Sequence, residues 1–295
     1  MSYLSPAQVE QFLEDGYIKL NGVFPRDVAE RWVARGWERL GYDPTDVSTW
    51  AAPRTHLPCE QRAEVRAFAP EAWAAICDLL GGEARINEPY KWSDGFITNL
   101  GIGADKPWRP ASSDVGGWHK DGDFFRHFLD SPEQGLLTIV LWTDVEHQAG
   151  PTYIAPDSVG VVARHLAEHP QGVAPDGFPT KQLISQCSRF VEATGKAGDV
   201  YLMHPYMLHA SSQNVRRLPR FITNPPVSLR EPMNFNRDDA GDFSLLERGV
   251  LRGLGVDRFD FKPTAERQRI VPERVRKQQA LREAEKARQQ AGAGS

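Results

Sequence analysis

The sequence predicts a β-sandwich or β-barrel domain, mainly β, with helices in front of it. Three observations support this fold class. The first third of the chain has helical periodicity with capping signals. After about residue 84, short apolar segments alternate with Gly, Pro, Asp and Asn. One of these segments, residues 136–142 (LLTIVLW), is a continuous apolar run, which is typical of a strand buried on both faces.

The helical part begins close to the N-terminus. Residues 5–8 resemble a capping box with proline at the first helical position, and Gly16 can end this helix. A short strand is expected at residues 17–20. Two longer helices are expected at residues 25–40 and 70–80, because each has large apolar side chains along one side and a glycine after its last residue.

The β part spans about residues 85–230. Regular alternation of strand and helix is not evident, which argues against a parallel sheet. One helix is expected at residues 158–168. Besides residues 136–142, the expected strands are residues 96–100, 151–155, 190–193, 199–203 and 220–229. We expect residues 1–271 to form a single domain, helical up to about residue 84.

Residues 272–295 form a charged tail rich in Ala and Gln. Val275 and Leu281 are nearly its only large apolar side chains. Such a segment can bury little surface, so we expect a solvated helix that frays into a disordered AGAGS end. A helix that binds a partner is the alternative.

The composition is that of an ordinary globular protein. Of the 295 residues, 40% are hydrophobic and 25% are charged, and the formal net charge of -4 argues against a basic nucleic-acid-binding protein. Three widely spaced cysteines without a CxxC motif are expected to be reduced thiols. The N-terminus does not resemble a signal peptide, and no apolar run approaches the roughly 20 residues of a membrane helix. We therefore expect a soluble, cytoplasmic protein with no membrane partner.

Several common enzyme motifs are missing from the sequence. It contains no GxxxxGK[ST] phosphate loop, no GxSxG nucleophile elbow and no HExxH motif. The sequence Gly101-Ile102-Gly103 lacks the third glycine and the following helix of a dinucleotide-binding fingerprint. These absences argue against several large enzyme classes.

The first chemical signal is Trp118-His119-Lys120-Asp121. In an extended backbone, residues i and i+2 project to the same side, so His119 and Asp121 can offer an imidazole nitrogen and a carboxylate oxygen to one ion. The alternative for such a short motif is a surface turn with a solvated aspartate.

A second group of residues strengthens the metal-site interpretation. His204 and His209 follow a mostly apolar segment, and Arg220 comes eleven residues after His209. Two histidines and one carboxylate leave three open positions on an ion, as in non-haem Fe(II) oxygenases. A 2-oxo acid such as 2-oxoglutarate can fill two of them, and dioxygen the third. The planar fork of a guanidinium suits the far carboxylate of 2-oxoglutarate.

Together these motifs resemble the phytanoyl-CoA dioxygenase family of Fe(II)/2-oxoglutarate-dependent oxygenases. The matching pieces are residues 118–121 (WHKD), 141–143 (LWT), 150–158 (GPTYIAPDS) and the block 198–220. The resemblance covers roughly residues 5–230 and implies a double-stranded β-helix, a cupin-like jelly roll, with iron at its open end. Asp157-Ser158-Val159 departs from the family, which usually has a histidine after this turn.

The resemblance also implies roles for individual residues. His119, Asp121 and His209 are the implied ligands of Fe(II) and the catalytic centre, because the family places its second histidine eleven residues before the arginine. His204 is then a packed histidine. Arg220 is implied to hold the distal carboxylate of 2-oxoglutarate, together with Ser211, which lies two residues after His209.

Four further residues are weaker candidates. Trp142 matches a family aromatic that lines the co-substrate pocket, and a tryptophan of the barrel core is the alternative. Asn99 and Thr138 lie on expected strands and can hydrogen-bond the co-substrate, although for Thr138 we favour an ordinary strand residue. His127 lies close to the metal motif, where it faces the substrate or belongs to a loop.

The expected reaction is hydroxylation of an unactivated C–H bond in a small organic molecule, with dioxygen consumed and succinate and CO2 released. Desaturation and ring formation remain open, whereas Asp121 occupies the position that a halide would need for halogenation. An apolar or mixed substrate is favoured because such clefts are mostly apolar. Two alternatives remain: a cupin-like metal enzyme that does not use 2-oxoglutarate, and a non-catalytic barrel that binds a ligand.

Overall fold

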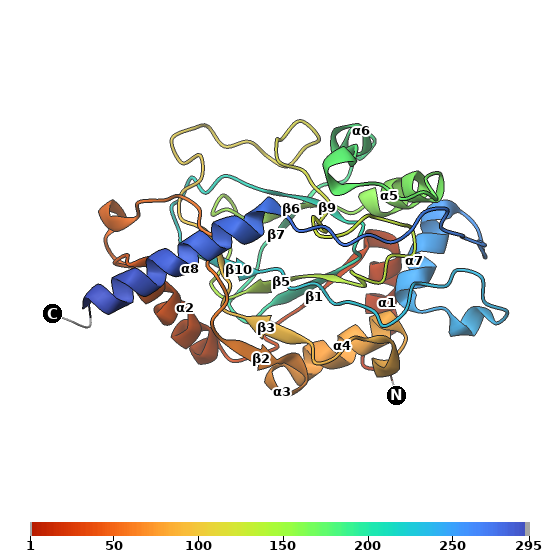
Figure 1. Ribbon diagram of the computed structural model, residues 1–295, viewed down its shortest axis with the longest axis horizontal. Helices are drawn as coiled ribbons and strands as arrows, with labels where there is room; N and C mark the ends of the chain where they lie inside the picture. The colour runs from red at the N-terminus through yellow and green to blue at the C-terminus, as the bar shows by residue number, and fades with distance from the viewer. Residues whose placement is uncertain (1, 293–295) are drawn as a thin grey trace.

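Two antiparallel sheets form the centre of the structure, a computed structural model that describes residues 2–292 (Figure 1). The larger sheet has the strand order β1-β8-β5-β10-β4, and the smaller has the order β7-β6-β9. Together they form the double-stranded β-helix, or jelly roll, that the family resemblance implies. The strands of these sheets are β1 (Tyr17–Leu20), β4 (Ile97–Asn99), β5 (Leu137–Leu141), β6 (Thr152–Ala155), β7 (Val191–Ala193), β8 (Val200–Met203), β9 (Leu208–Ser211) and β10 (Arg220–Thr223).

Helices account for more of the chain than strands do. Helical residues make up 32% and strand residues 18%, so the description "mainly β" was too strong. The cause is the shortness of the strands, none of which exceeds five residues. A separate two-stranded sheet joins β2 (Arg62–Glu64) and β3 (Lys91–Ser93).

The helices expected in the first third of the chain are confirmed. The capping box of Ser5 and Gln8 is formed, and Gly16 adopts the left-handed conformation that ends the first helix. Helix α7 was not predicted, although Ser244 and Glu247 form a capping box at its start. The helices are α1 (Pro6–Asp15), α2 (Arg26–Leu40), α3 (Val65–Phe68), α4 (Pro70–Leu80), α5 (Ser158–Ala167), α6 (Thr180–Ile184), α7 (Leu245–Leu254) and α8 (Glu273–Gly292).

An aromatic layer joins the larger sheet to the helices of the first third. Trp32 of α2 stacks on Trp142, just after β5, with ring centroids 4.6 Å apart. Phe24, Phe68 and Phe96 surround the Trp142 ring at 5.0 to 6.1 Å. Aromatic pairs of this kind contribute about 0.5–1.5 kcal/mol each beyond the burial of their area. The layer therefore fixes the larger sheet firmly against α2.

Four strands differ from the sequence prediction, because β2, β3 and β9 were not expected and β10 is shorter than expected. The strand expected at residues 220–229 ends at Thr223, because Pro225 and Pro226 have no backbone N–H to donate to a ladder. Strand β9 was not predicted, yet it pairs with β6 along all four of its residues. None of the helices within residues 2–292 combines the length and apolar character needed to cross a membrane.

The charged tail forms helix α8, as expected, and Figure 1 shows it in blue running toward α2. One contact was not expected. Glu285 is buried and accepts hydrogen bonds from Arg39 of α2 at 2.6 and 3.2 Å. Arg39 is also buried and donates to Asp94 and to the carbonyl of Pro58. Helix α8 is thus exposed along most of its described residues but attached at one point. The end of the AGAGS sequence, residues 293–295, lies outside the described residues.

We predict that Glu285→Ala lowers the free energy of unfolding by about 2 kcal/mol, because it removes charge-assisted hydrogen bonds from the buried guanidinium of Arg39, which also pairs with Asp94 at 3.0 Å and with Glu60 at 3.6 Å. Urea unfolding measures this loss, and limited trypsin digestion should cleave α8 faster. Glu283→Ala, an exposed change on the same helix, is the control. Equal unfolding and digestion curves for the two variants would contradict a role of the Arg39–Glu285 pair in holding α8.

Candidate metal centre

The centre is built on a backbone bridge between two distant segments. The N–H of His119 donates to the carbonyl of His209 at 2.9 Å, and the N–H of His209 donates to the carbonyl of His119 at 3.1 Å. Residues that exchange both bonds lie directly opposite each other, and their side chains project to the same side. The two imidazole rings therefore meet, with centroids 4.2 Å apart.

Asp121 completes the cluster. Its Oδ1 lies 3.5 Å from the Nε2 of His119 and 3.5 Å from the Nε2 of His209. One ligand atom from each of the three residues lies within 4.8 Å of the others. Within the described residues, this group is the one set of at least three His, Cys, Asp or Glu side chains with that spacing. It has the ligand chemistry of a facial two-histidine, one-carboxylate iron site.

Hydrogen bonds orient both imidazoles toward the centre of the cluster. The Nδ1 of His119 lies 2.9 Å from the carbonyl of Gly117, and the Nδ1 of His209 lies 3.1 Å from the carbonyl of Met207. A carbonyl only accepts, so each Nδ1 carries the proton and each Nε2 presents its lone pair. Outer hydrogen bonds of this kind fix the tautomer of metal-binding histidines.

The carboxylate of Asp121 is also oriented. Asn224, directly after β10, donates from Nδ2 to the Oδ2 of Asp121 at 3.0 Å, which leaves Oδ1 directed at the histidines. Burial alone would raise the pKa of Asp121, but the two imidazoles, His209 foremost, hold that pKa well below its usual range. Gly122 has φ +117°, and a Cβ there would lie 2.6 Å from Phe125 and 2.7 Å from His127. Glycine is therefore needed directly after Asp121.

Arg220 lies on the larger sheet with its side chain buried. It is 1% exposed, and Nη1 donates to the carbonyl of Gly150 at 2.9 Å. Its Nε and Nη2 have no hydrogen-bond partner within residues 2–292. Burial, and after it the positive charge of Arg54, lower the pKa of the Arg220 guanidinium to about 9, so it remains a cation at neutral pH. A buried cation with two unsatisfied N–H groups is costly unless an anion binds it.

Strand register decides which predicted co-substrate residues share a face with Arg220. Ile222 on β10 is paired with Leu141 on β5, so Leu141 projects to the same side of the sheet as Arg220. Side chains alternate along a strand, so Trp142 and Thr138 project to the opposite side.

The contacts of Trp142 and Thr138 agree with this register. Trp142 lies in the aromatic layer and donates from Nε1 to the hydroxyl of Thr223 at 3.0 Å. The hydroxyl of Thr138 donates to the carbonyl of Pro225 at 2.6 Å. These contacts contradict the predicted role of both residues in a co-substrate pocket and favour the structural alternative.

Asn99 shares a face with Arg220, because the two residues are paired between β4 and β10. Its side chain is already engaged: Nδ2 donates to the carbonyl of Ser212, and Oδ1 accepts from the N–H groups of Gly101 and Ile102. Asn99 therefore holds the loops beside Arg220, and its amide has little capacity left for a ligand.

Ser211 lies on the same side of β9 as His209 and is paired with Thr152 on β6. Thr152 comes two residues after Gly150, whose carbonyl accepts from Arg220. The hydroxyl of Ser211 makes no hydrogen bond to the part of the chain that the structure describes. It is therefore free to donate to a ligand held near Arg220.

The remaining candidate histidines lie outside the metal cluster. His204 is fully buried, its Nδ1 accepts from the N–H of Tyr206, and burial lowers its pKa to about 3. It packs against Gly249 of α7. His127 is also buried, and its Nδ1 lies 3.1 Å from the Nζ of Lys120. The two side chains link the metal motif to the loop that follows it.

Two residues near the centre were missed by the sequence analysis. Asn224 has the same parity along β10 as Arg220, but a single asparagine after a strand is too common to attract notice. Arg54 lies in a segment without helical or strand periodicity, and only its pairing with β4 reveals its position. In both cases the informative signal is strand register, which requires the pairing partner to be known.

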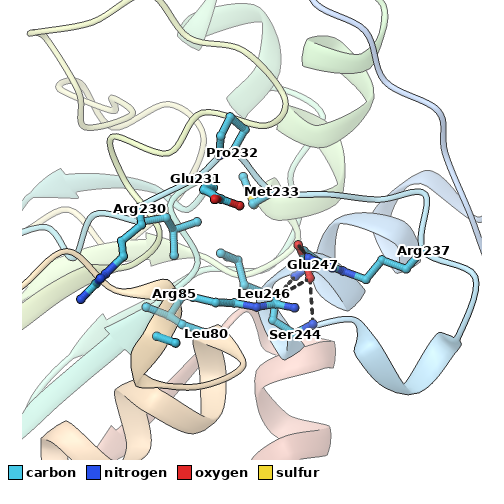
Figure 2. A pocket seen from close by; sticks show the side chains of 12 residues that line it. Leu80, Arg85, Arg230, Glu231, Pro232, Met233, Arg237, Ser244, Leu246 and Glu247 are labelled. Atoms are coloured by element: carbon cyan, nitrogen blue, oxygen red, sulfur yellow. Dashed lines mark hydrogen bonds and ion pairs between the residues drawn. The ribbon is translucent and has the colours of Figure 1, made fainter.

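A cavity of about 170 Å³ lies between the loop after β10 and the start of α7 (Figure 2). The carboxylate of Glu247 fills its polar side and accepts from Arg85, Arg237 and Ser244 at 2.8 to 3.0 Å. The lining contains none of the triad residues and not Arg220. Because Glu247 pairs with Arg85 and Arg237 and the lining contains no candidate metal ligand, this cavity is a structural ion-pair cluster and not the candidate centre.

Comparisons with solved structures give weak similarities. HygX from Streptomyces hygroscopicus with nickel and 2-oxoglutarate bound is 15% identical, over 76% of this chain and 87% of that chain, with a TM-score of 0.43. EctD from S. alaskensis with 2-oxoglutarate and 5-hydroxyectoine is 22% identical, over 77% of each chain, with a TM-score of 0.41. No curated protein matches the chain in sequence. Similarities at this level carry no argument about the chemistry of the chain.

A family model gives a stronger result. Residues 12–221 match the model described as Phytanoyl-CoA dioxygenase (PhyH), and this match contains the three residues of the cluster and Arg220. The resemblance indicated by the four sequence segments, WHKD among them, is thereby confirmed. The chain belongs to the phytanoyl-CoA dioxygenase (PhyH) family and is accordingly a non-haem iron enzyme that depends on 2-oxoglutarate.

Proposed function

We propose that His119, Asp121 and His209 hold Fe(II), and that Arg220 and Ser211 hold the distal carboxylate of 2-oxoglutarate. We further propose that the enzyme hydroxylates an unactivated C–H bond of a small organic molecule, consuming dioxygen and releasing succinate and CO2. The observation that carries the proposal is the buried guanidinium of Arg220, which has two unpaired N–H donors beside a metal-type triad.

The donor set fits both groups. Three ligand atoms with lone pairs directed at one point, one of them on an ionised carboxylate, suit a divalent iron ion. Strand β10 carries Arg220 near its start and Asn224, in contact with Asp121, directly after its end. At ~3.3 Å per residue, the Cα atoms of Arg220 and Asn224 lie ~13 Å apart. The inward side chains and 2-oxoglutarate, a five-carbon diacid, can together fill this span.

When bound, Fe(II) with 2-oxoglutarate supplies the activation of dioxygen that C–H oxidation requires. The protein residues position the reactants. Arg220 fixes the far end of the diacid through charge-assisted hydrogen bonds, Ser211 donates to the same carboxylate, and Asn224 keeps Asp121 in one orientation. The carbonyls of Gly117 and Met207 hold the imidazoles in the tautomer that can bind metal.

The unpaired Arg220 nitrogens favour this proposal over a cupin-like enzyme that does not use 2-oxoglutarate, since a buried cation needs an anionic partner and the distal carboxylate of 2-oxoglutarate supplies one. Anaerobic addition of Fe(II) and then 2-oxoglutarate should produce their visible charge-transfer band. Absence of the band, or turnover that needs metal but not 2-oxoglutarate, would decide for the alternative. The small-molecule substrate and the cytoplasmic location remain predictions.

Replacing Arg220 should separate co-substrate binding from metal binding. We expect Arg220→Met to raise the dissociation constant of 2-oxoglutarate roughly 30-fold or more, because a buried charge partner is lost. Fe(II) affinity should stay nearly unchanged. The thermal midpoint of the ligand-free protein should hold or rise, since a buried unpaired cation is removed. An equal loss of metal and 2-oxoglutarate binding, measured by anaerobic titration, would show that Arg220 is structural.

The two histidines near β9 should respond differently to truncation. His209→Ala is expected to weaken Fe(II) binding by more than the roughly 10- to 100-fold typical of an outer contact, because a ligand atom is removed. His204→Ala should lower the thermal midpoint through the cavity it leaves, while the folded protein binds Fe(II) with normal affinity. Loss of metal affinity in His204→Ala but not in His209→Ala would reverse the assignment.

Asn224 acts on the metal through Asp121, as a positioning residue. Asn224→Ala should lower Fe(II) affinity roughly 10- to 100-fold, because Asp121 loses the contact that orients it. The exposed change Asn21→Ala is the control and should leave the Fe(II) titration unchanged. Wild-type Fe(II) affinity in Asn224→Ala would mean that the hydrogen bond does not orient the ligand.

A further inference from the structure

The segment before β2 adds an outer strand to the larger sheet. The N–H of Leu57 donates to the carbonyl of Phe96, the N–H of Thr98 to the carbonyl of Thr55, and the N–H of Leu100 to that of Pro53, all at 2.8 Å. His56 lies directly opposite Ile97 in this antiparallel pairing. Residues 53–57 therefore run along β4 as a further, irregular strand.

The register of this outer strand places Arg54 in one row with Arg220. Since His56 is opposite Ile97, Arg54 is opposite Asn99, and Asn99 is paired with Arg220. Directly opposed residues project to the same side of a sheet. Arg54, Asn99 and Arg220 thus lie side by side across three neighbouring strands, on the face that carries the candidate co-substrate site.

The two arginines of this row differ in their surroundings. Arg220 is buried, whereas Arg54 is exposed. Arg54 makes no hydrogen bond and no ion pair with any residue of the described range 2–292. Burial and then the charge of Arg54 lower the pKa of Arg220. The Arg54 charge therefore acts on the Arg220 end of the candidate site.

Two like charges on one face repel each other, and anions that bind there relieve the repulsion. The distal carboxylate of 2-oxoglutarate supplies one anion, and the buried Arg220 with Ser211 offers the donors that it needs. The exposed guanidinium of Arg54 then has no carboxylate of its own. It is exposed to solvent on the same side of the sheet as Arg220.

We infer that Arg54 is a specificity residue that binds an anionic group of the substrate, so that the substrate is a small molecule carrying a carboxylate or phosphate group. The inference rests on the proposed function, because it assigns 2-oxoglutarate to Arg220. The planar fork of a guanidinium suits both oxyanions. This role of Arg54 would narrow the substrate class from any small molecule to small molecules that carry an anionic group.

The test uses full-length protein loaded anaerobically with Fe(II) and 2-oxoglutarate. The visible band of the loaded protein first checks the proposed function. Calorimetric titration then compares three probes: hexanoate, hexyl phosphate and the neutral hexanamide. We expect at least one of the two anions to bind roughly fivefold or more tightly than hexanamide. The anion that binds more tightly distinguishes a carboxylate from a phosphate substrate.

Variants then assign the preference to Arg54. Arg54→Gln should abolish the preference for anions and leave the dissociation constant of 2-oxoglutarate within about twofold of wild type. Arg54→Lys should retain part of the preference for anions. Arg248→Gln, an exposed arginine on α7, is the matched control and should bind all three probes as the wild type does.

Three results would overturn the inference. The first is that the wild type binds hexanamide as tightly as both anions. The second is that Arg54→Gln retains the preference for anions. The third is that Arg54→Gln weakens 2-oxoglutarate binding as strongly as Arg220→Met does, which would assign Arg54 to the co-substrate. A missing charge-transfer band in the first step would instead count against the proposed function.

Discussion

The candidate centre depends on two backbone hydrogen bonds between His119 and His209. They join the WHKD motif to β9 as a further strand segment of the smaller sheet, and they place both imidazoles on the same side. Everything else at the centre refines this one pairing. The carbonyls of Gly117 and Met207 set the tautomers, and Asn224 turns Asp121 toward the rings. A slip of one residue in the bridge would turn one histidine to the opposite face.

Strand β10 couples this centre to the co-substrate site. Arg220 opens the strand and Asn224 follows its end, so a single rigid strand fixes the spacing between the buried cation and the carboxylate ligand. On the opposite face of the larger sheet, the aromatic layer around Trp142 packs the sheet against α2. A well-packed support of this kind lets the fold tolerate the unpaired nitrogens of Arg220, which oppose folding until an anion arrives.

The site residues that can be recognised from the sequence are those whose chemistry and spacing are local. His119 and Asp121 are two residues apart, and His209, Ser211 and Arg220 fall in one short block, so a resemblance could identify them. Trp142, Thr138 and Arg54 depend on which strand lies beside which and in what register. The first two turn to the helical face, and the last turns to the face of Arg220. Neither fact can be inferred without the strand pairing. The burial of Glu285 was missed for a related reason, since its partner Arg39 lies on a distant helix.

The attachment of α8 has a consequence for the outer strand that carries Arg54. Arg39 donates to the carbonyl of Pro58, directly after residues 53–57, and to Asp94, directly after β3. The other carboxylate oxygen of Asp94 accepts from the N–H groups of Glu60 and Gln61. One buried guanidinium therefore holds α8, the end of the outer strand and the end of β3 together. A buried cation stays in position only while its carboxylate partners remain. Loss of Glu285 therefore disturbs both α8 and residues 53–57, the segment that positions Arg54.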